Sequence, residues 1–369
     1  MPPPLLIGLD ASRATSPHPT GTEVYSHRLI EALLDAGSSR RFRLYFRDAP
    51  APGDFPGADH RVIPFPRLWT HLRLSWEMAR HPPDLLFVPS HVLPLIRPSL
   101  TLVTVHDLGY LSFPHAHPRL QRLYLDLSTR WNAHVATHVI ADSEATRADL
   151  AAHYGTPPEK VTVAYPGYDE TLAPVRDPAA IAAAKARCGV EGDYLLHLGT
   201  LQPRKNLSRL VTAFADVEAD LTLVLAGRRG WLTDDLFAQV RRLGLTDRVR
   251  FPGYIPQGDK AVLLSGALAF VFPSLYEGFG LPVLEAQACG CPVIYSDTSS
   301  LPEVAGDAAL PLPPTDVAAW TAAIDRLAAD PALRADLVER GYANLQRFSW
   351  QRCAATVLET IERLAAAGR

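Results

Sequence analysis

The sequence has few of the features that mark metal-binding, secreted or membrane-spanning proteins. Only four of its 369 residues are cysteines, and none of them form a C-x-x-C pair. Neither a zinc site nor a disulfide framework is expected, and a reducing cytoplasm is the expected compartment. No apolar run reaches the roughly 20 residues that a membrane helix needs. The N-terminus also lacks the charged and apolar regions of a signal peptide.

Neither sign of charge is in excess. Lys and Arg number 36, Asp and Glu number 39, and the formal net charge is -3. A near-neutral chain is a poor candidate for extensive nucleic-acid binding. Hydrophobic residues make up 47% and charged residues 20%, which excludes disordered and fibrous classes. The length favours about two domains.

Short apolar runs alternate with helical patterns in the first half of the chain. The runs cover residues 5–9, 44–46, 85–88, 100–105 and 138–141, and the helical patterns cover 23–34, 120–134 and 144–154. Runs this apolar are typical of strands buried on both faces of a parallel sheet. Their alternation with helices predicts doubly wound α/β units.

The second half repeats this alternation. Its expected strands are 194–198, 221–226, 249–251, 268–272 and 293–295, and its expected helices are 207–217, 234–243, 282–289 and 317–328. Pro and Gly at 165–178 indicate a linker. We therefore predict an α/β fold of two Rossmann-like domains facing a cleft, residues 1–170 and 171–348, with a final helix at 349–369 packing back on the first domain. Ligands of such sheets bind beyond the carboxyl ends of strands.

The segment from Tyr276 to Ala286, YEGFGLPVLEA, follows one of these strands. Its glycines allow close backbone approach, and its proline suits the first turn of a helix. Free N–H groups at that helix start would attract an anion. Glu277 lies before the helix and Glu285 one turn inside it; either carboxylate could instead act as a helix cap.

The E-x7-E spacing from Glu277 to Glu285 resembles the signature of retaining glycosyltransferases of the GT-B family 4. The resemblance covers nearly the whole chain. The segments HDLGYLSFP and AGRRGWL are most similar to bacterial mannosyltransferases that use GDP-mannose to build surface polysaccharide. The resemblance implies that Glu285 accepts hydrogen bonds from the ribose and that Glu277 meets hydroxyls of the donor hexose. The donor-binding turn would comprise Gly278, Phe279, Gly280 and Leu281.

A second segment, HLGTLQPRKN, follows the first strand of the second half. Gly199 would let its turn approach a phosphate, and Arg204 and Lys205 add two positive charges. The chain has only four lysines. A solvated basic turn is the structural alternative. The resemblance implies that Arg204 and Lys205 hold the diphosphate of the donor.

Three further positions are candidates. His106 leaves a strand beside Asp107; the pair could be structural, but the resemblance implies that His106 contacts the hexose near its C6 hydroxyl. The loop TGTEVY keeps Gly21 where the family often has G-x-G, with Glu23 at the second place. Gly21 is a plausible phosphate contact, and Glu23 is favoured in a first helical turn. Tyr254 lies in a Pro-Gly segment that could be an ordinary turn; the resemblance implies that this loop lines the base pocket.

Some segments favour structural interpretations. Cys289-Gly290-Cys291 is typical of a packed helix end, and Ser143 of a helix N-cap. Residues 67–76 mix basic and aromatic side chains. They could rest on a membrane surface, although a helix covering the core is the favoured interpretation.

We therefore predict a cytoplasmic, retaining hexosyltransferase with a nucleotide-sugar donor and a saccharide or lipid-linked acceptor. No D-x-D triplet is present, so we predict no metal ion and no cofactor. Preorganised cations and a helix N-terminus can stabilise the leaving diphosphate. Alternatives are a UDP-hexose donor, a sugar-nucleotide epimerase, a phosphorylase, or a non-catalytic sugar-nucleotide-binding subunit. A dehydrogenase is disfavoured, since no G-x-G-x-x-G opens a strand-helix unit.

Overall fold

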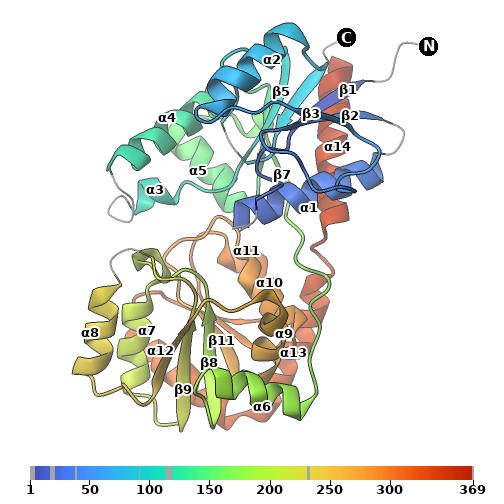
Figure 1. Ribbon diagram of the computed structural model, residues 1–369. Coiled ribbons are helices and arrows are strands. Elements are labelled where there is room, and N and C mark those ends of the chain that lie inside the picture. Colours follow the sequence, from blue (N-terminus) through green and yellow to red (C-terminus); the bar gives the residue numbers. More distant parts are fainter. Residues whose placement is uncertain are drawn as a thin grey trace. The chain divides into compact units, whose positions relative to one another are not determined.

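The computed structural model describes residues 5–16, 21–37, 40–90, 92–113, 119–230 and 233–367. The chain divides into two compact units (Figure 1). Unit 1 comprises Met1–Gly167 with Phe348–Arg369, and unit 2 comprises Tyr168–Arg347. The division falls at Gly167, beside the boundary of residue 170 expected from the Pro and Gly content. The last helix of the chain belongs to unit 1.

Unit 1 contains a parallel sheet of seven strands in the order β3-β2-β1-β4-β5-β6-β7. The strands are β1 (Leu6–Asp10), β2 (Arg41–Phe46), β3 (Asp59–Val62), β4 (Leu85–Val88), β5 (Leu100–Val105), β6 (His138–Ala141) and β7 (Val161–Val163). Its described helices are α1 (Gly21–Ala36), the π-helix η1 (Trp69–Leu74), α2 (Ser75–Arg80), α3 (Gly109–Ser112), α4 (Arg119–Val135), α5 (Glu144–Tyr154), the 3₁₀ turn η3 (Pro158–Lys160) and α14 (Trp350–Ala367).

The continuous apolar runs of unit 1 cover both faces of its sheet. In β4, Leu85 and Phe87 join the core cluster that includes α1 and α14, whereas Leu86 and Val88 join the cluster on the other face, which includes η1 and α5 (Figure 1). Alternate residues of a strand point to opposite faces, so only an unbroken apolar run suits both clusters. From α14, Trp350, Val357 and Ile361 lie in the first cluster, although they follow β7 by almost 200 residues.

Unit 2 contains a parallel sheet of six strands in the order β10-β9-β8-β11-β12-β13. The strands are β8 (Asp193–Leu198), β9 (Leu221–Ala226), β10 (Val249–Gly253), β11 (Ala269–Phe272), β12 (Val293–Ser296) and β13 (Leu310–Leu312). Its described helices are α6 (Pro178–Arg187), the 3₁₀ turn η4 (Pro203–Lys205), α7 (Leu207–Ala215), α8 (Asp234–Arg242), α9 (Gln257–Gly266), α10 (Leu281–Ala288), α11 (Leu301–Ala305), α12 (Val317–Ala329) and α13 (Pro331–Leu345).

Both sheets have the Rossmann strand order, in which the first strand lies between the second and the fourth. The predicted fold class of two Rossmann-like α/β domains is therefore confirmed. The order reverses between β1 and β4 in unit 1 and between β8 and β11 in unit 2. Loops that leave these strand pairs diverge, and ligands of such sheets bind where they diverge.

Several elements were not predicted from the sequence. Strand β3 is exposed along its whole length, so it carries no apolar run, and its pairing with β2 defines it as a strand. The expected linker was too long, because Asp177 accepts a hydrogen bond from the backbone N–H of Ala179 and caps α6. Helix α6 is mostly alanine and has little apolar periodicity. Strands β7 and β13 have three residues each.

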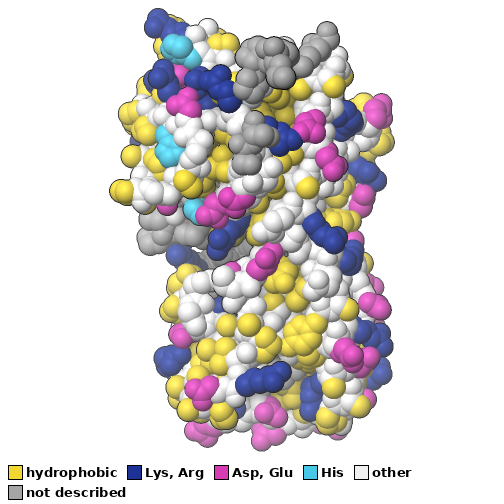
Figure 2. All heavy atoms as spheres, turned by 90° about the vertical axis from the view of Figure 1, so that its right-hand side faces the viewer, with side chains coloured by type: hydrophobic (Ala, Val, Ile, Leu, Met, Phe, Trp, Pro, Cys, Tyr) yellow, Lys and Arg dark blue, Asp and Glu magenta, His cyan; other side chains and the backbone are white. Residues whose placement is uncertain are grey.

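The surface shows no dominant sign of charge on the face drawn in Figure 2, where basic and acidic side chains are interspersed. This distribution agrees with the net charge of -3. Among the described residues, no helix combines the length and apolar character needed to span a bilayer.

Candidate active site

A cluster of charged side chains lies in unit 2, on the loops that follow β8 and β11. These strands are the neighbours at which the strand order reverses. The loops are joined through their backbones, since Leu275 N–H donates to the carbonyl of Arg204 over 2.9 Å. The HLGTLQPRKN and YEGFGLPVLEA segments, some 70 residues apart in the chain, therefore form one site.

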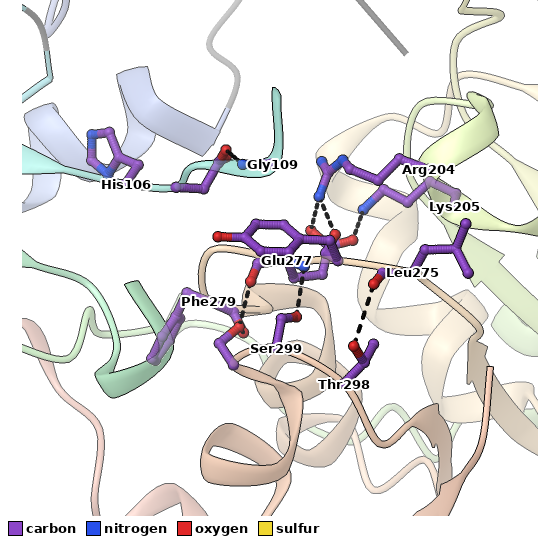
Figure 3. A network of polar contacts seen from close by, with 12 residues as sticks. His106, Gly109, Arg204, Lys205, Leu275, Glu277, Phe279, Thr298 and Ser299 are labelled. Carbon is purple, nitrogen blue, oxygen red and sulfur yellow. Dashed lines mark hydrogen bonds and ion pairs between the residues drawn. The ribbon is translucent and has the colours of Figure 1, made fainter. Parts of the chain in front are cut away.

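Arg204, Lys205 and Glu277 form an ion triad (Figure 3). Arg204 Nη1 lies 2.9 Å from Glu277 Oε2, and Lys205 Nζ lies 2.6 Å from Glu277 Oε1. Arg204 also donates to the carbonyl of Tyr276. Lys205 and Glu277 are only 7% and 8% exposed. One carboxylate thus holds two cations, and the triad keeps a net positive charge.

The charges of this triad keep Glu277 ionised. Burial alone would raise the pKa of Glu277, but Lys205 and Arg204 outweigh that effect and lower its pKa to about 2. Lys205 Nζ also lies 4.6 Å from the ring centroid of Phe272, within range of a cation–π contact. The three charges are therefore fixed in place, and no rearrangement is needed to present positive charge.

The backbone of the Glu277 loop is held by two serines of the loop after β12. Ser299 Oγ accepts from Glu277 N–H at 2.8 Å, and Ser300 Oγ donates to the carbonyls of Glu277 and Phe279 at 2.9 and 2.6 Å. Ser299 has a φ of 50°, which is costly for a residue other than glycine. Neither serine was predicted from the sequence, where their only signal was a polar pair shortly after a strand.

Close backbone packing requires glycine at two positions of this site. A Cβ on Gly227, after β9, would lie 1.8 Å from the carbonyl oxygen of Gly199. Gly280 has a φ of 118° and caps α10, which begins at Leu281. The N-cap Gly280 lies three residues after Glu277, so the positive end of the α10 dipole begins beside the triad, as an anion site requires.

Glu285 of α10 is also ion-paired. Lys260 Nζ of α9 lies 2.8 Å from Glu285 Oε1, a partner that the sequence analysis missed. Tyr254, which follows β10, is 61% exposed, and the guanidinium of Arg228 lies 5.1 Å from its ring centroid. Three of the four lysines of the chain lie in unit 2, and two of them contact the glutamates of the E-x7-E segment.

His197, in the strand before Gly199, is buried and neutral. Burial first, and the charge of Lys205 second, lower the pKa of His197 to about 4. Its Nδ1 lies 3.1 Å from the carbonyl oxygen of Val271. In the neutral ring this nitrogen carries the hydrogen, because a carbonyl can only accept. His197 thus joins β8 to β11 without adding charge to the site.

In unit 1, His106 follows β5 and Asp142 follows the neighbouring strand β6. His106 Nδ1 lies 2.6 Å from Asp142 Oδ2, and the ring of Tyr25 meets the imidazole edge-on at 4.7 Å. Burial opposes protonation of His106, yet Asp142 prevails and raises the pKa of His106. His106 Nε2 has no hydrogen-bond partner within the described part of the chain. Asp142 was missed as a functional residue because 36 residues separate it from His106.

The other candidates of unit 1 have local partners. Asp107 accepts from the backbone N–H of Gly109 at 2.9 Å, and Glu23 is paired with Arg13 at 3.1 Å. Gly21 begins α1, and a Cβ built on it meets no described atom within 4 Å. Thr20, at the start of the TGTEVY loop, lies outside the described residues, as do Pro114 of HDLGYLSFP and Trp231 and Leu232 of AGRRGWL.

The structural interpretations of two other segments are confirmed. Ser143 caps α5, where its side chain accepts from Thr146 N–H. Cys289 caps the end of α10, and both Cys289 and Cys291 are buried thiols. Among the residues that the structure describes, no group of three or more His, Cys, Asp or Glu side chains could hold a metal ion.

Comparison with known proteins identifies the family. The model of "Glycosyl transferases group 1" matches residues 183–344, and the model of "Glycosyltransferase Family 4" matches residues 19–172. The O-antigen chain mannosyltransferase B of Escherichia coli is 32% identical over 81% of this chain and 79% of its own length. The chain belongs to glycosyltransferase family 4. The predicted family and enzyme class, a hexosyltransferase, are confirmed.

Two solved structures share the fold. The sucrose-phosphate synthase of Thermosynechococcus elongatus superimposes with a TM-score of 0.76 at 25% identity, over 98% of this chain and all of that one. The Anabaena protein HepE, solved in complex with UDP and glucose, superimposes with a TM-score of 0.74 at 21% identity, over 97% of this chain and 99% of that one. Both similarities agree with a GT-B glycosyltransferase fold.

Proposed function

We propose that this glycosyltransferase transfers mannose from GDP-mannose to a saccharide or lipid-linked acceptor during surface polysaccharide synthesis. We also propose that it retains the anomeric configuration and needs no metal ion. The similarity to an O-antigen chain mannosyltransferase over most of both chains supports mannose as the sugar. The glycosyltransferase family supports a nucleotide-sugar donor.

One observation carries the proposal: Arg204 and Lys205 converge on Glu277 immediately before the start of α10. The arginine offers planar paired donors and the lysine a point charge, both suited to phosphate oxygens. The start of α10 adds the positive end of its dipole. This combination suits a diphosphate that gains negative charge as it leaves.

The proposed reaction is a same-face displacement. The bond between the hexose C1 and the β-phosphate oxygen breaks, and a bond forms between C1 and the acceptor oxygen on the same face. The departing phosphate takes the proton of the acceptor hydroxyl, so no side chain need serve as a general base. Arg204 and Lys205 stabilise the charge on the phosphate before that proton arrives.

Four side chains would orient the donor. In the proposal, Glu285 accepts from the ribose hydroxyls, with Lys260 holding its carboxylate, and Glu277 meets the hexose hydroxyls while it holds the two cations. His106 contacts the hexose through Nε2, the ring nitrogen that Asp142 leaves available. A buried carboxylate that loses its hydroxyl partner penalises analogues strongly, so these contacts would select the sugar.

A cavity of about 320 Å³ in unit 1 is the proposed acceptor site. It opens beyond the carboxyl ends of β1 and β2 and is lined by Arg13, Arg47, Trp69, Thr70 and Tyr124 among others. Its lining is mostly polar, with hydroxyl, guanidinium and carboxylate groups beside the aromatic rings of Trp69 and Tyr124. Its hydroxyl, guanidinium and aromatic groups suit a sugar or a sugar phosphate.

We propose a cytoplasmic location, where the nucleotide sugar would be available. All four cysteines are free thiols and are buried. Free thiols of this kind are typical of proteins in reducing compartments.

Donor identity is tested by thermal stabilisation with GDP-mannose, UDP-glucose and the free nucleotides GDP and UDP. We expect GDP-mannose to raise the Tm most, and Arg204→Ala to abolish the shift. A larger Tm shift with a UDP-hexose would identify that sugar nucleotide as the donor instead. The absence of a Tm shift with every nucleotide sugar would contradict the proposal. The Tm measurements of the wild type and of Arg204→Ala are repeated with EDTA, which should change neither result.

Retention is tested by NMR of the product formed from GDP-mannose. We expect the anomeric configuration of the donor in the product, and the inverted configuration would contradict the mechanism. The same assay tests the alternative of a non-catalytic subunit. Such a protein would bind the donor but transfer nothing, and Glu277→Ala would change neither result.

A further inference from the structure

Helix α4 turns a stripe of large apolar side chains to solvent. Leu120, Leu123, Tyr124 and Leu127 recur at helical spacing and are 83%, 53%, 48% and 55% exposed. The residues that α4 buries are instead Thr129, Asn132 and Ala133. A helix of a soluble domain normally turns its apolar stripe to the core. The stripe of α4 meets no covering element within the described chain.

A second apolar stripe occurs on η1 and α2. Leu68, Leu72 and Trp76 are spaced four residues apart and are each more than half exposed. The same segment also buries Trp69 and Leu74 in the core of unit 1. Both interpretations of residues 67–76 thus apply to different side chains: some cover the core, and others are available for a partner.

The two stripes are parts of one surface. The rings of His71 and Tyr124 lie 6.4 Å apart, which joins η1 to α4. Ser75 Oγ accepts from Leu95 N–H at 2.9 Å, which joins α2 to the loop before β5. That loop reaches α4 through Arg97, whose guanidinium lies 5.1 Å from the ring centroid of Trp131. We call this surface the apolar face; its exposed members are Leu68, Leu72, Trp76, Leu95, Ile96, Leu120, Leu123, Tyr124 and Leu127.

The charge around the apolar face is basic. Seven arginines lie on its three segments: Arg67, Arg73, Arg80, Arg97, Arg119, Arg122 and Arg130. The two acidic residues of these segments are both engaged. Glu77 is buried and paired with Arg61 at 2.8 Å and with Arg73 at 3.5 Å, and Asp126 accepts from Tyr154 at 2.6 Å. The whole chain has a net charge of -3, so the excess of arginine is local. This charge complements an anionic partner.

We propose that the apolar face docks on an anionic lipid bilayer. Leucine, tryptophan and arginine on one amphipathic surface are the composition of helices that lie in the membrane interface. The guanidinium of Arg80 lies 4.4 Å from the ring centroid of Trp76. The tryptophan can therefore enter the headgroup layer while the charge of Arg80 stays solvated. The nine exposed members of the apolar face also form one surface, whereas exposed apolar side chains on a soluble monomer are usually scattered singly.

The acceptor cavity opens at the edge of this face. Leu68, His71 and Tyr124 line the cavity, and Leu68 and Tyr124 belong to the apolar face. This step depends on the proposed function: an acceptor anchored in the bilayer would reach the cavity without leaving the membrane. Docking itself does not depend on it, because the face and its charges are independent of the donor site.

The experiment is flotation of the full chain with vesicles of phosphatidylcholine alone or with added phosphatidylglycerol. We expect flotation with the anionic vesicles only, weakened by high salt. Leu123→Glu/Leu127→Glu should reduce binding by about tenfold or more. Leu243→Glu, at an exposed leucine of unit 2, is the control and should leave binding unchanged. Neither Leu123 nor Leu127 lines the cavity, so donor-induced thermal stabilisation should be unaffected.

The proposal is overturned if anionic vesicles do not retain the protein, or if the double variant floats like the wild type. A second copy of the chain is the alternative occupant of the face. In that case the wild type would sediment as a dimer, the double variant would sediment as a monomer, and neither would float. If nucleotide sugars do not raise the Tm of the wild type, the proposed function is contradicted, and the docking result still stands.

Discussion

The carboxyl ends of the two sheets have the same architecture and different chemistry. In unit 2 the loops bring together Arg204, Lys205 and Glu277, a group with a net positive charge whose two glutamate oxygens are both hydrogen-bonded. In unit 1 the loops bring together His106 and Asp142, a pair that leaves the His106 Nε2 available. The first arrangement suits a phosphate, and the second suits a hydroxyl.

This difference follows from how each site meets the energetic cost of burial. A buried charge is tolerated only with partners, so unit 2 supplies a carboxylate that fixes both cations. In unit 1, Asp142 supplies the partner for one nitrogen of the buried His106, and the other nitrogen has no hydrogen-bond partner among the described residues. The same strand order can therefore hold a charged or a neutral ligand, depending on the residues that follow the strands.

The largest expected effect concerns the backbone of the two sites. Gly227→Ala would place a Cβ 1.8 Å from the Gly199 carbonyl oxygen, whereas Gly21→Ala meets no described atom within 4 Å. We expect Gly227→Ala to lower the free energy of unfolding by about 3 kcal/mol or more, and Gly21→Ala to change it by less than about 1 kcal/mol. Urea unfolding measures both, and similar values for the two variants would contradict the comparison.

The next effect is on catalysis in unit 2. Arg204→Ala removes one of two cations aimed at the leaving phosphate, and we expect kcat/KM to fall by about 10²- to 10³-fold. Arg241→Ala, at an exposed arginine of α8, is the control and should retain full activity. Thermal unfolding would show that both variants fold. Activity of Arg204→Ala near that of wild type would remove this residue from the mechanism.

The two sites should also differ in pH dependence. The pKa of Glu277 is about 2 against an ordinary value of 4.5, so its ion pairs stabilise the fold above pH 4.5. That contribution, on the order of a few kcal/mol, is lost as the pH falls through about 2. We expect the difference in unfolding free energy between wild type and Glu277→Gln to be constant from pH 7 to 5 and to shrink at lower pH. A difference that shrinks above pH 5 would contradict the assignment.

In unit 1 the direction is reversed. The pKa of His106 is raised above 6.5 by Asp142, so protonation stabilises the fold below pH 6.5, and this contribution is lost as the pH rises through the raised pKa. Comparing unfolding free energies of wild type and His106→Ala across pH 6 to 9 would show this loss. A constant difference over that range would mean that Asp142 does not perturb the histidine.

The smallest effect is expected for the positioning of His106. Asp142→Ala should lower the pKa of His106, leave its tautomer undefined and reduce transfer by about tenfold. A titration by ¹⁵N NMR of the imidazole measures the pKa and the tautomer, and Glu144→Gln on α5 is the control. An unchanged His106 titration would show that Asp142 has only a structural role.

Part of the site could be predicted because its residues are close in sequence. Arg204 with Lys205, and Glu277 with the turn at Gly278 to Leu281, each lie on one loop after one apolar strand. Asp142, Lys260 and Ser299 could not be predicted in this way. Each comes from a different strand-loop unit, and the order of strands in the sheet determines which of those units are neighbours.

The comparison of α14 with α4 gives the same lesson for the fold. Both helices are amphipathic in sequence, and both were predicted as helices. Only the structure shows that α14 buries Trp350, Val357 and Ile361 in unit 1, while α4 leaves Leu120 and Leu123 exposed. Periodicity defines an apolar stripe but does not identify what covers it.

The sequence by itself determined the alternation of strands and helices, the two-domain plan and the candidate loops, because burial on both faces of a sheet imposes continuous apolar runs. The tertiary structure decided which loops meet, which charges pair and which apolar side chains stay exposed. Those outcomes depend on contacts between residues far apart in the chain, and local patterns do not encode which distant partners come together.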